Sequence, residues 1–371
     1  MDFTPSEAQR ELGALTRQIV TDHVTVERLR AAEKAGARFD QVLWAALAQA
    51  GVLSADVGLL ERCSVLVELG RALAPVPYLP TVAVAGAALA EFGSAPQRDR
   101  WLAPALAGQA VLAVAPCTDD AARPTAVGRS EPGWRLSAPT PGPPLAWRLT
   151  GEVTAVTAGP VADAFLVTAD TAAGPSVFVV LPGDRGVTLE RQRMVNHDDA
   201  AQLILDNVPL PDDRRMFAPD LVGRVGDLLT VGLCAYQLGV LERGLELTAE
   251  YARTRMQFGR PIGAFQAVSQ RLADAYIDVQ AVELALWHAA WTLENPETGE
   301  APAAVATAKF WAADAGHRVA HTLVHVHGGT GIDLEHPVHR YFLAAKRTEF
   351  EHGSATASLL RLGDVLASHP L

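Results

Sequence analysis

Two short stretches of the sequence carry side chains suited to a phosphate-bearing ligand. Residues 255–259 read Arg-Met-Gln-Phe-Gly, and arginine suits phosphate because its planar guanidinium offers several donors and stays charged. Residues 325–331 read His-Val-His-Gly-Gly-Thr-Gly. The three glycines remove β-carbons from one short loop, which lets a ligand approach the backbone closely. Each stretch alone is also typical of an ordinary joint between two helices.

Helical patterns surround both stretches and must position them. Residues 228–251 are apolar on nearly every side in their first half, which indicates a helix buried among others. An apolar stripe at three- and four-residue steps then predicts a second bundle helix. Further helical segments are expected at about 301–325 and 335–366. Arg255 and Gln257 therefore lie close to a chain reversal, where their donors can point outward. The stripe consists of Phe265, Val268, Leu272, Tyr276, Val279, Val282 and Leu286.

The chain divides into three segments by its pattern. Residues 1–110 carry apolar residues at helical spacing, in runs that end near glycine. Residues 111–215 hold short β-rich runs separated by turn residues, which predict a small barrel or sandwich. Helices resume in residues 216–371. The sequence thus predicts an α+β protein with an N-terminal α-helical domain, a middle β domain and a C-terminal four-helix bundle.

Composition argues against several classes of function. The 371 residues are 49% hydrophobic and can bury a substantial core. A formal charge of −11 does not suit a protein that grips nucleic-acid phosphates. The longest apolar run, Val82–Ala90, is too short to span a membrane, and the N-terminus lacks a signal pattern, so we expect a cytoplasmic protein. Cys63, Cys117 and Cys234 lack metal-binding spacing, so neither a metal nor structural disulfides are expected.

Together and in this order, the two stretches resemble the signature of the acyl-CoA dehydrogenase family. These flavoproteins oxidise the Cα–Cβ bond of acyl-CoA thioesters, and their signature runs Arg-x-x-Phe-Gly, then Phe-Gln, then Gln-x-x-Gly-Gly-x-Gly. The resemblance covers essentially the whole chain, including the order of helices, strands and helices. It implies FAD as the cofactor, an acyl-CoA as the substrate and electron-transfer flavoprotein as the acceptor.

The resemblance also implies which residues would hold the FAD, whose flavin ring would lie in a neighbouring subunit. The residues matched to the pyrophosphate end are Arg255, Gln257, Phe258 and Gly259. Those matched to the adenosine end are His325, Gly328, Gly329 and Gly331. His325 stands where the family usually has glutamine, and it can still donate one hydrogen bond.

The carboxylate base of the family is absent from its usual positions. In most members it is a Glu followed by Gly, six residues after the lysine that matches Lys346, and here that position is His352. The alternative position on the first bundle helix matches Leu229. A base must reach the substrate α-proton within hydrogen-bond distance. Glu351 or His352 could serve as the base, or both could have solvated or structural roles.

The strand segment departs from the family where the flavin would be held. The family's Trp-Ile-Thr segment, whose Trp and Thr contact the flavin, matches Ala155, Val156 and Thr157, so only Thr157 is preserved. Replacing an indole by a methyl group removes a large stacking surface. The family's Thr-Glu-Pro and Gly-Ser-Asp stretches correspond to AVAPCTDD and PTAVGRSE.

These departures leave three hypotheses. In the first, the chain resembles the non-catalytic subunit of heteromeric actinobacterial acyl-CoA dehydrogenases of sterol side-chain breakdown, which assemble as α2β2 tetramers. The partner would then supply the Glu and the flavin pocket. In the second, the chain is a self-sufficient homo-oligomeric dehydrogenase with an unusual base. In the third, the fold serves as a non-redox scaffold or binding protein, similar to the DNA-associated branch of the family, although the charge of −11 does not favour a basic surface.

Overall fold

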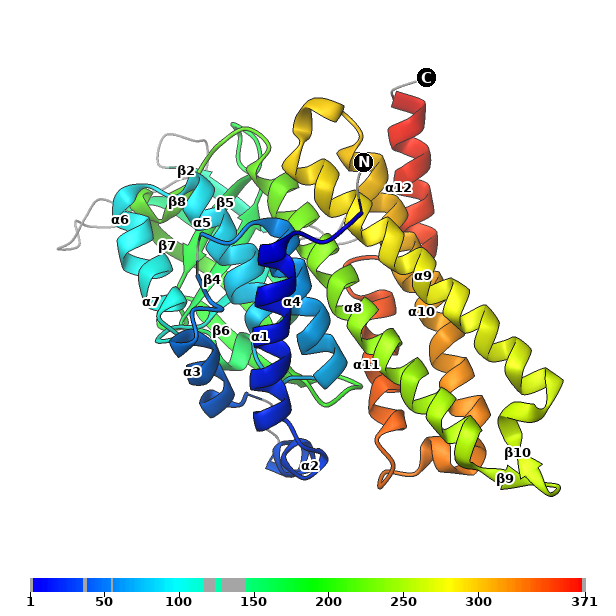
Figure 1. Ribbon diagram of the computed structural model, residues 1–371. Coiled ribbons are helices and arrows are strands. Elements are labelled where there is room, and N and C mark those ends of the chain that lie inside the picture. The colour runs from blue at the N-terminus through cyan, green and yellow to red at the C-terminus, as the bar shows by residue number, and fades with distance from the viewer. Residues whose placement is uncertain (1–2, 36–38, 55, 117–123, 129–144, 369–371) are drawn as a thin grey trace. The chain divides into compact units, whose positions relative to one another are not determined.

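The computed structural model describes residues 3–35, 39–54, 56–116, 124–128 and 145–368. Helices come first, strands follow, and helices form most of the remaining described chain (Figure 1). This order confirms the predicted α+β class. The stretches AVAPCTDD and PTAVGRSE run into residues 117–123 and 129–144, outside the described residues.

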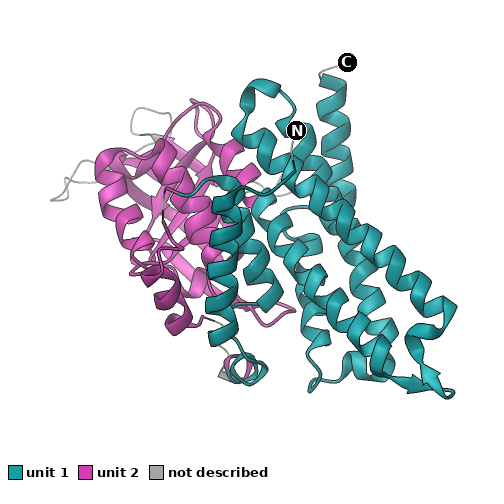
Figure 2. Cartoon of the chain, in the orientation of Figure 1, with its two compact units in different colours: residues 1–31, 57–74, 230–371 teal, residues 32–56, 75–229 magenta. Residues whose placement is uncertain are grey.

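The described chain forms two compact units, coloured separately in Figure 2. Unit 1 consists of residues 1–31, 57–74 and 230–371, and unit 2 consists of residues 32–56 and 75–229. Helices α2 (Val26–Ala35) and α8 (Leu221–Thr254) each contribute residues to both units. The other helices of unit 1 are α1 (Glu7–His23), α4 (Leu59–Ala72), α9 (Gln266–Glu294), α10 (Ala301–His327), α11 (Val338–Phe350) and α12 (Ala355–Ser368).

Helix α8 is the buried helix that the sequence predicts. From Thr230 to Leu241 every residue except Tyr236 is buried. Within unit 1, α8 crosses α4 with the two backbones in contact, because a β-carbon on Gly70 would overlap main-chain atoms of Tyr236. Among the described residues, α8 alone is long and apolar enough to cross a membrane, and 78% of its most apolar window is buried inside the protein. A core helix passes the same test.

Two details of the predicted bundle differ from the structure. The predicted segment 335–366 is two helices, since the chain turns between α11 and α12, where His352 and Gly353 adopt φ values of 56° and 103°. Residues in that region of φ cannot continue a right-handed helix. The apolar stripe of α9 is buried only in its second half. Tyr276, in the first half, is 58% exposed.

Unit 2 holds two four-stranded sheets. The first has the order β1-β4-β5-β8, and the second has the order β2-β3-β7-β6. Strands β1 and β4 are parallel, and the other pairs are antiparallel. Their bounds are β1 Leu112–Ala115, β2 Thr125–Gly128, β3 Leu145–Thr157, β4 Ala164–Ala169, β5 Ser176–Val180, β6 Val187–Arg193, β7 Asp199–Pro211 and β8 Arg215–Met216.

Both sheets contribute to one apolar core, as in a sandwich. Phe165 and Phe178 from the first sheet pack in the same cluster as Leu149 and Leu203 from the second, and all four are fully buried. The helices that lie wholly in the described part of this unit are α3 (Gln41–Gln49), the π-helical η1 (Leu79–Gly86), α5 (Ala87–Phe92), α6 (Ala95–Gln97), the π-helical η2 (Arg98–Leu102), α7 (Ala103–Leu106) and the 3₁₀ helices η3 (Gly159–Val161) and η4 (Asp212–Arg214).

Candidate functional site

The first predicted stretch is a hairpin that follows α8. Strand β9 (Met256–Gln257) pairs antiparallel with β10 (Arg260–Pro261), and its base is closed by the Ile262 N–H, which donates to the Arg255 carbonyl at 2.8 Å. The two loop residues, Phe258 and Gly259, have φ values of 52° and 78°. Two positive φ values in a two-residue loop are typical of a type I′ turn, which favours glycine and strains a phenylalanine. Gly259 is therefore required by the turn.

The side chains of the hairpin lie on the surface of unit 1. Arg255, Gln257 and Arg260 are exposed, and Phe258 is 92% exposed. The Arg260 guanidinium lies 4.2 Å from the centroid of the Phe265 ring, which fixes its direction. The hairpin thus presents cationic groups, an amide and an exposed aromatic ring, a combination that suits a phosphate-bearing ligand with an apolar neighbour.

The second predicted stretch is a 3₁₀ turn, η7 (Gly328–Ile332), that follows α10. Each of its three glycines stands in a different local environment. Gly328 has φ 59° and ψ −135°, a conformation that only glycine adopts readily. A β-carbon on Gly331 would lie 2.6 Å from the Val324 carbonyl oxygen, so Gly331 is needed for packing onto α10. The predicted close approach of a ligand therefore suits Gly329, where a β-carbon would meet nothing within 4 Å.

The structure brings the two stretches together at one end of unit 1 (Figure 1). The ring of Tyr251, in the last turn of α8, stacks on the ring of His327, the last residue of α10, with centroids 4.4 Å apart. Sequence reasoning missed both residues. The signal was the clustering of histidine around the glycine loop, at His325, His327 and His336.

The residues at this end of unit 1 fit the pyrophosphate and adenosine half of FAD. Arg255 and Arg260 bring positive charge for phosphate, Gln257 and His325 bring exposed hydrogen-bonding groups, and Gly329 leaves open space beside the backbone. FAD, when bound, supplies a flavin that accepts the hydride. The assignment of these residues to FAD stays a prediction.

The flavin half of the predicted site is altered. Thr157, in unit 2, ends β3, is half-buried and pairs with Ala200 of β7. Ala155, at the position of the family's Trp, lies in a β-bulge with φ 55°, and its N–H donates to the Gln192 Oε1 at 2.9 Å. Ala155 offers a methyl group where the resemblance implies an indole, so the stacking surface expected beside a flavin is absent at this position.

The two candidate bases lie in the turn between α11 and α12. Glu351 is half-buried, and the Arg347 Nη2 donates to one of its carboxylate oxygens at 3.2 Å. The last turn of α11 is also bonded to α10, since the buried Lys309 donates from Nζ to the Thr348 carbonyl at 2.7 Å. Glu351 thus pairs with a residue one turn back on α11, and His352 adopts a left-handed conformation with φ 56°. The role of either residue as the base stays a prediction.

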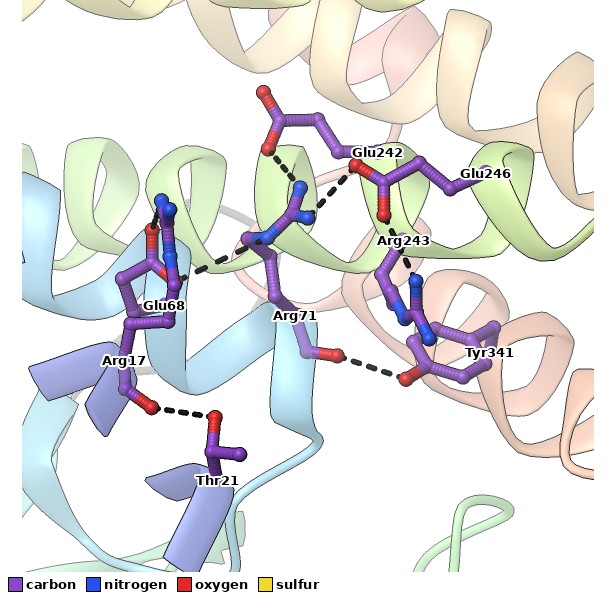
Figure 3. A network of polar contacts seen from close by, with 8 residues as sticks. All are labelled: Arg17, Thr21, Glu68, Arg71, Glu242, Arg243, Glu246 and Tyr341. Carbon is purple, nitrogen blue, oxygen red and sulfur yellow. Dashed lines mark hydrogen bonds and ion pairs between the residues drawn. The ribbon is translucent and has the colours of Figure 1, made fainter. Parts of the chain in front are cut away.

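A network of ion pairs connects α1, α4 and α8, the helix that leads into the hairpin (Figure 3). Arg71 of α4 binds Glu242 and Glu246 of α8 at 2.8 and 2.7 Å, and Arg17 of α1 binds Glu68 of α4 at 2.6 Å. Burial raises the pKa of Glu242, and the Arg71 guanidinium opposes that rise. The residues drawn are Arg17, Thr21, Glu68, Arg71, Glu242, Arg243, Glu246 and Tyr341.

Comparison with known proteins places this architecture in one family. The model of the acyl-CoA dehydrogenase C-terminal domain matches residues 230–366, and that of the N-terminal domain matches residues 6–109. Acyl-CoA dehydrogenase FadE27 of Mycobacterium tuberculosis is 46% identical over 387 aligned positions, covering 100% of both chains. Acyl-CoA dehydrogenase FadE28 of the same organism is 32% identical and covers 93% of each chain.

Solved structures agree with the sequence comparison. A chain of the ChsE4-ChsE5 complex from Mycobacterium tuberculosis superposes with a TM-score of 0.92 at 47% identity, covering 100% of both chains. A chain of the Tcur3481-Tcur3483 steroid ACAD, in its G363A variant, gives a TM-score of 0.87 at 38% identity and covers 98% of each chain. The predicted cofactor, FAD, is the cofactor of this family of oxidoreductases. The chain therefore belongs to the acyl-CoA dehydrogenase family.

Proposed function

We propose that this chain is the partner subunit of a heteromeric acyl-CoA dehydrogenase. Its hairpin and glycine loop bind the pyrophosphate and adenosine half of an FAD. A related chain supplies the flavin pocket, the glutamate base and most contacts to the acyl-CoA. The assembly is an α2β2 tetramer, and its electrons leave through electron-transfer flavoprotein.

One contrast within the chain supports this proposal above all others. The hairpin and the glycine loop keep the turn geometry and the exposed donors that a dinucleotide needs. The flavin position carries Ala155 in a bulge, and the base position carries His352 in a left-handed turn. A chain that kept its own complete site would have reason to retain both halves, whereas a partner subunit needs only the first.

The relatives add weight to a pair of unlike chains. Both the ChsE4-ChsE5 complex and the Tcur3481-Tcur3483 steroid ACAD consist of two different proteins, and this chain aligns with one chain of each over nearly its full length. By that likeness the substrate is an acyl-CoA with a steroid-derived acyl group. The proposed localisation is cytoplasmic, where acyl-CoA and the electron acceptor are both at hand.

The proposal is tested by purifying the chain alone and together with a co-expressed related chain, then counting flavins from the visible spectrum. The lone chain should be colourless, and the pair should be yellow with fewer flavins than chains. Within the pair, Arg255→Gln should release FAD, whereas Arg253→Gln should not. Arg253 is the matched control, because it is also exposed near the end of α8 but lies outside the motif. A lone chain that binds one FAD per chain and oxidises an acyl-CoA would overturn the proposal.

A further inference from the structure

We infer that Tyr251, His327 and His336 form an aromatic clasp, which holds the hairpin and the glycine loop in a fixed position relative to each other. The three residues are positioning residues, since they act through the two joints that they connect. Tyr251 belongs to α8, His327 to α10, and His336 to the segment that follows the glycine loop. The effect on FAD binding rests on the proposed function, and the mechanical link between the joints does not.

The clasp begins at the last turn of α8. The Arg255 N–H donates to the Tyr251 carbonyl at 2.8 Å, so Tyr251 lies directly beneath the first residue of the hairpin. Its ring stacks on the His327 ring with an interplanar angle of 24°. His336 closes the cluster, with its ring centroid 4.8 Å from that of His327 and 6.3 Å from that of Tyr251. Helix α8 therefore shares one aromatic cluster with residues on both sides of the glycine loop.

His327 packs against Tyr251 on one side and the glycine loop on the other, so its position couples the two joints. The residue is 3% exposed, and its Nδ1 lies 2.8 Å from the Leu323 carbonyl oxygen. A carbonyl only accepts, so Nδ1 carries the hydrogen and donates it. On the other side, the Gly331 backbone packs so closely that a β-carbon there would lie 3.2 Å from the His327 Cβ. A shift of His327 would therefore disturb both the Tyr251 ring and the glycine loop.

A dinucleotide that touches both joints requires them at a fixed separation. If the two joints moved independently, binding would have to restrict both of them, and that ordering costs affinity. A preformed clasp removes part of the cost. Aromatic pairs contribute enough to change a binding constant by about two- to tenfold.

The test uses the full-length chain, with or without a co-expressed relative, and five variants. Tyr251→Leu and His327→Leu each remove a ring, and their double variant removes both. Tyr251→Phe and His327→Phe keep a ring at each position and serve as matched controls. Amide hydrogen exchange is measured across residues 255–261 and 328–332, which reports on the joints whether or not FAD is bound.

We expect Tyr251→Leu to speed exchange in the glycine loop and His327→Leu to speed it in the hairpin. The Phe variants should keep the slow amide exchange of the wild-type chain in both joints. In the flavin-containing complex, the dissociation constant for FAD should rise by about two- to tenfold in each Leu variant, with no further rise in the double variant. Faster exchange confined to the mutated joint, or additive losses of FAD affinity, would overturn the clasp. A wild-type complex without FAD would instead contradict the proposed function and leave the exchange result to decide on the clasp.

Discussion

Arg71→Met should lower the stability of unit 1 by breaking the ion pairs between α4 and α8. It removes the guanidinium that binds Glu242 and Glu246, and it leaves Glu242 without its cation. The Arg71 and Glu242 side chains are 22% and 26% exposed, so the pair lies between the exposed and buried cases. Exposed pairs contribute below about 1 kcal/mol, whereas breaking a buried pair costs about 3–5 kcal/mol. We therefore expect a loss of about 2 kcal/mol in the free energy of unfolding.

Denaturant unfolding and thermal melting measure this loss, and the melting temperature should fall by about 3 °C. Arg243→Met is the control, since Arg243 pairs with Glu246 at 3.0 Å on a more exposed surface and should cost less than about 1 kcal/mol. Adding Glu242→Gln to Arg71→Met should recover part of the loss, because no unpaired charge then remains.

The pH dependence of Arg71→Met follows from the pKa of Glu242. Burial raises that pKa in the folded state, and without Arg71 nothing on α4 opposes the rise. The folded state then binds a proton more readily than the unfolded state, so its stability increases as the pH falls from neutral toward the ordinary value of about 4.3. The cost of Arg71→Met should shrink over that range. An equal cost for Arg71→Met and Arg243→Met, constant with pH, would refute the reasoning.

Three further predictions concern the joints and the turn. Gly331→Ala should lower the melting temperature, at a cost of about 1–3 kcal/mol for the overlap with Val324, whereas Gly329→Ala should leave it unchanged, and a reversed order would contradict the packing argument. Burial lowers the pKa of His327, so the unfolded state binds more protons as the pH falls below about 6.5; His327→Phe should remove part of the resulting acid destabilisation, measured by melting temperature against pH. Glu351→Gln should leave acyl-CoA oxidation by the two-chain complex within about twofold, and loss of turnover with FAD retained would instead identify Glu351 as a base in this chain.

Much of the architecture follows from local patterns. The switch from three- and four-residue spacing to short β-rich runs and back predicts the order of helices, strands and helices. The continuous apolar run in the first half of α8 predicts its burial, because an apolar surface on every side needs neighbours on every side. The Arg-x-x-Phe-Gly stretch predicts a chain reversal, and the hairpin confirms it.

Other features depend on contacts between distant segments. The turn at His352 interrupts a pattern that is otherwise helical, and only Gly353 beside it signals the break. The exposure of Tyr276 could not be read from a stripe, since periodicity shows which residues share a face and not what covers that face. The stack of Tyr251 on His327 joins residues 76 positions apart (327 − 251), which spacing alone does not predict.

The flavin content of the two-chain complex tests the central claim most directly. We expect the pair to bind FAD, Arg255→Gln in this chain alone to release it, and Arg253→Gln to leave it bound. The release should occur although the partner keeps an intact flavin pocket. A complex in which Arg255→Gln retains its full flavin content would contradict the claim that this chain binds the nucleotide end of the cofactor.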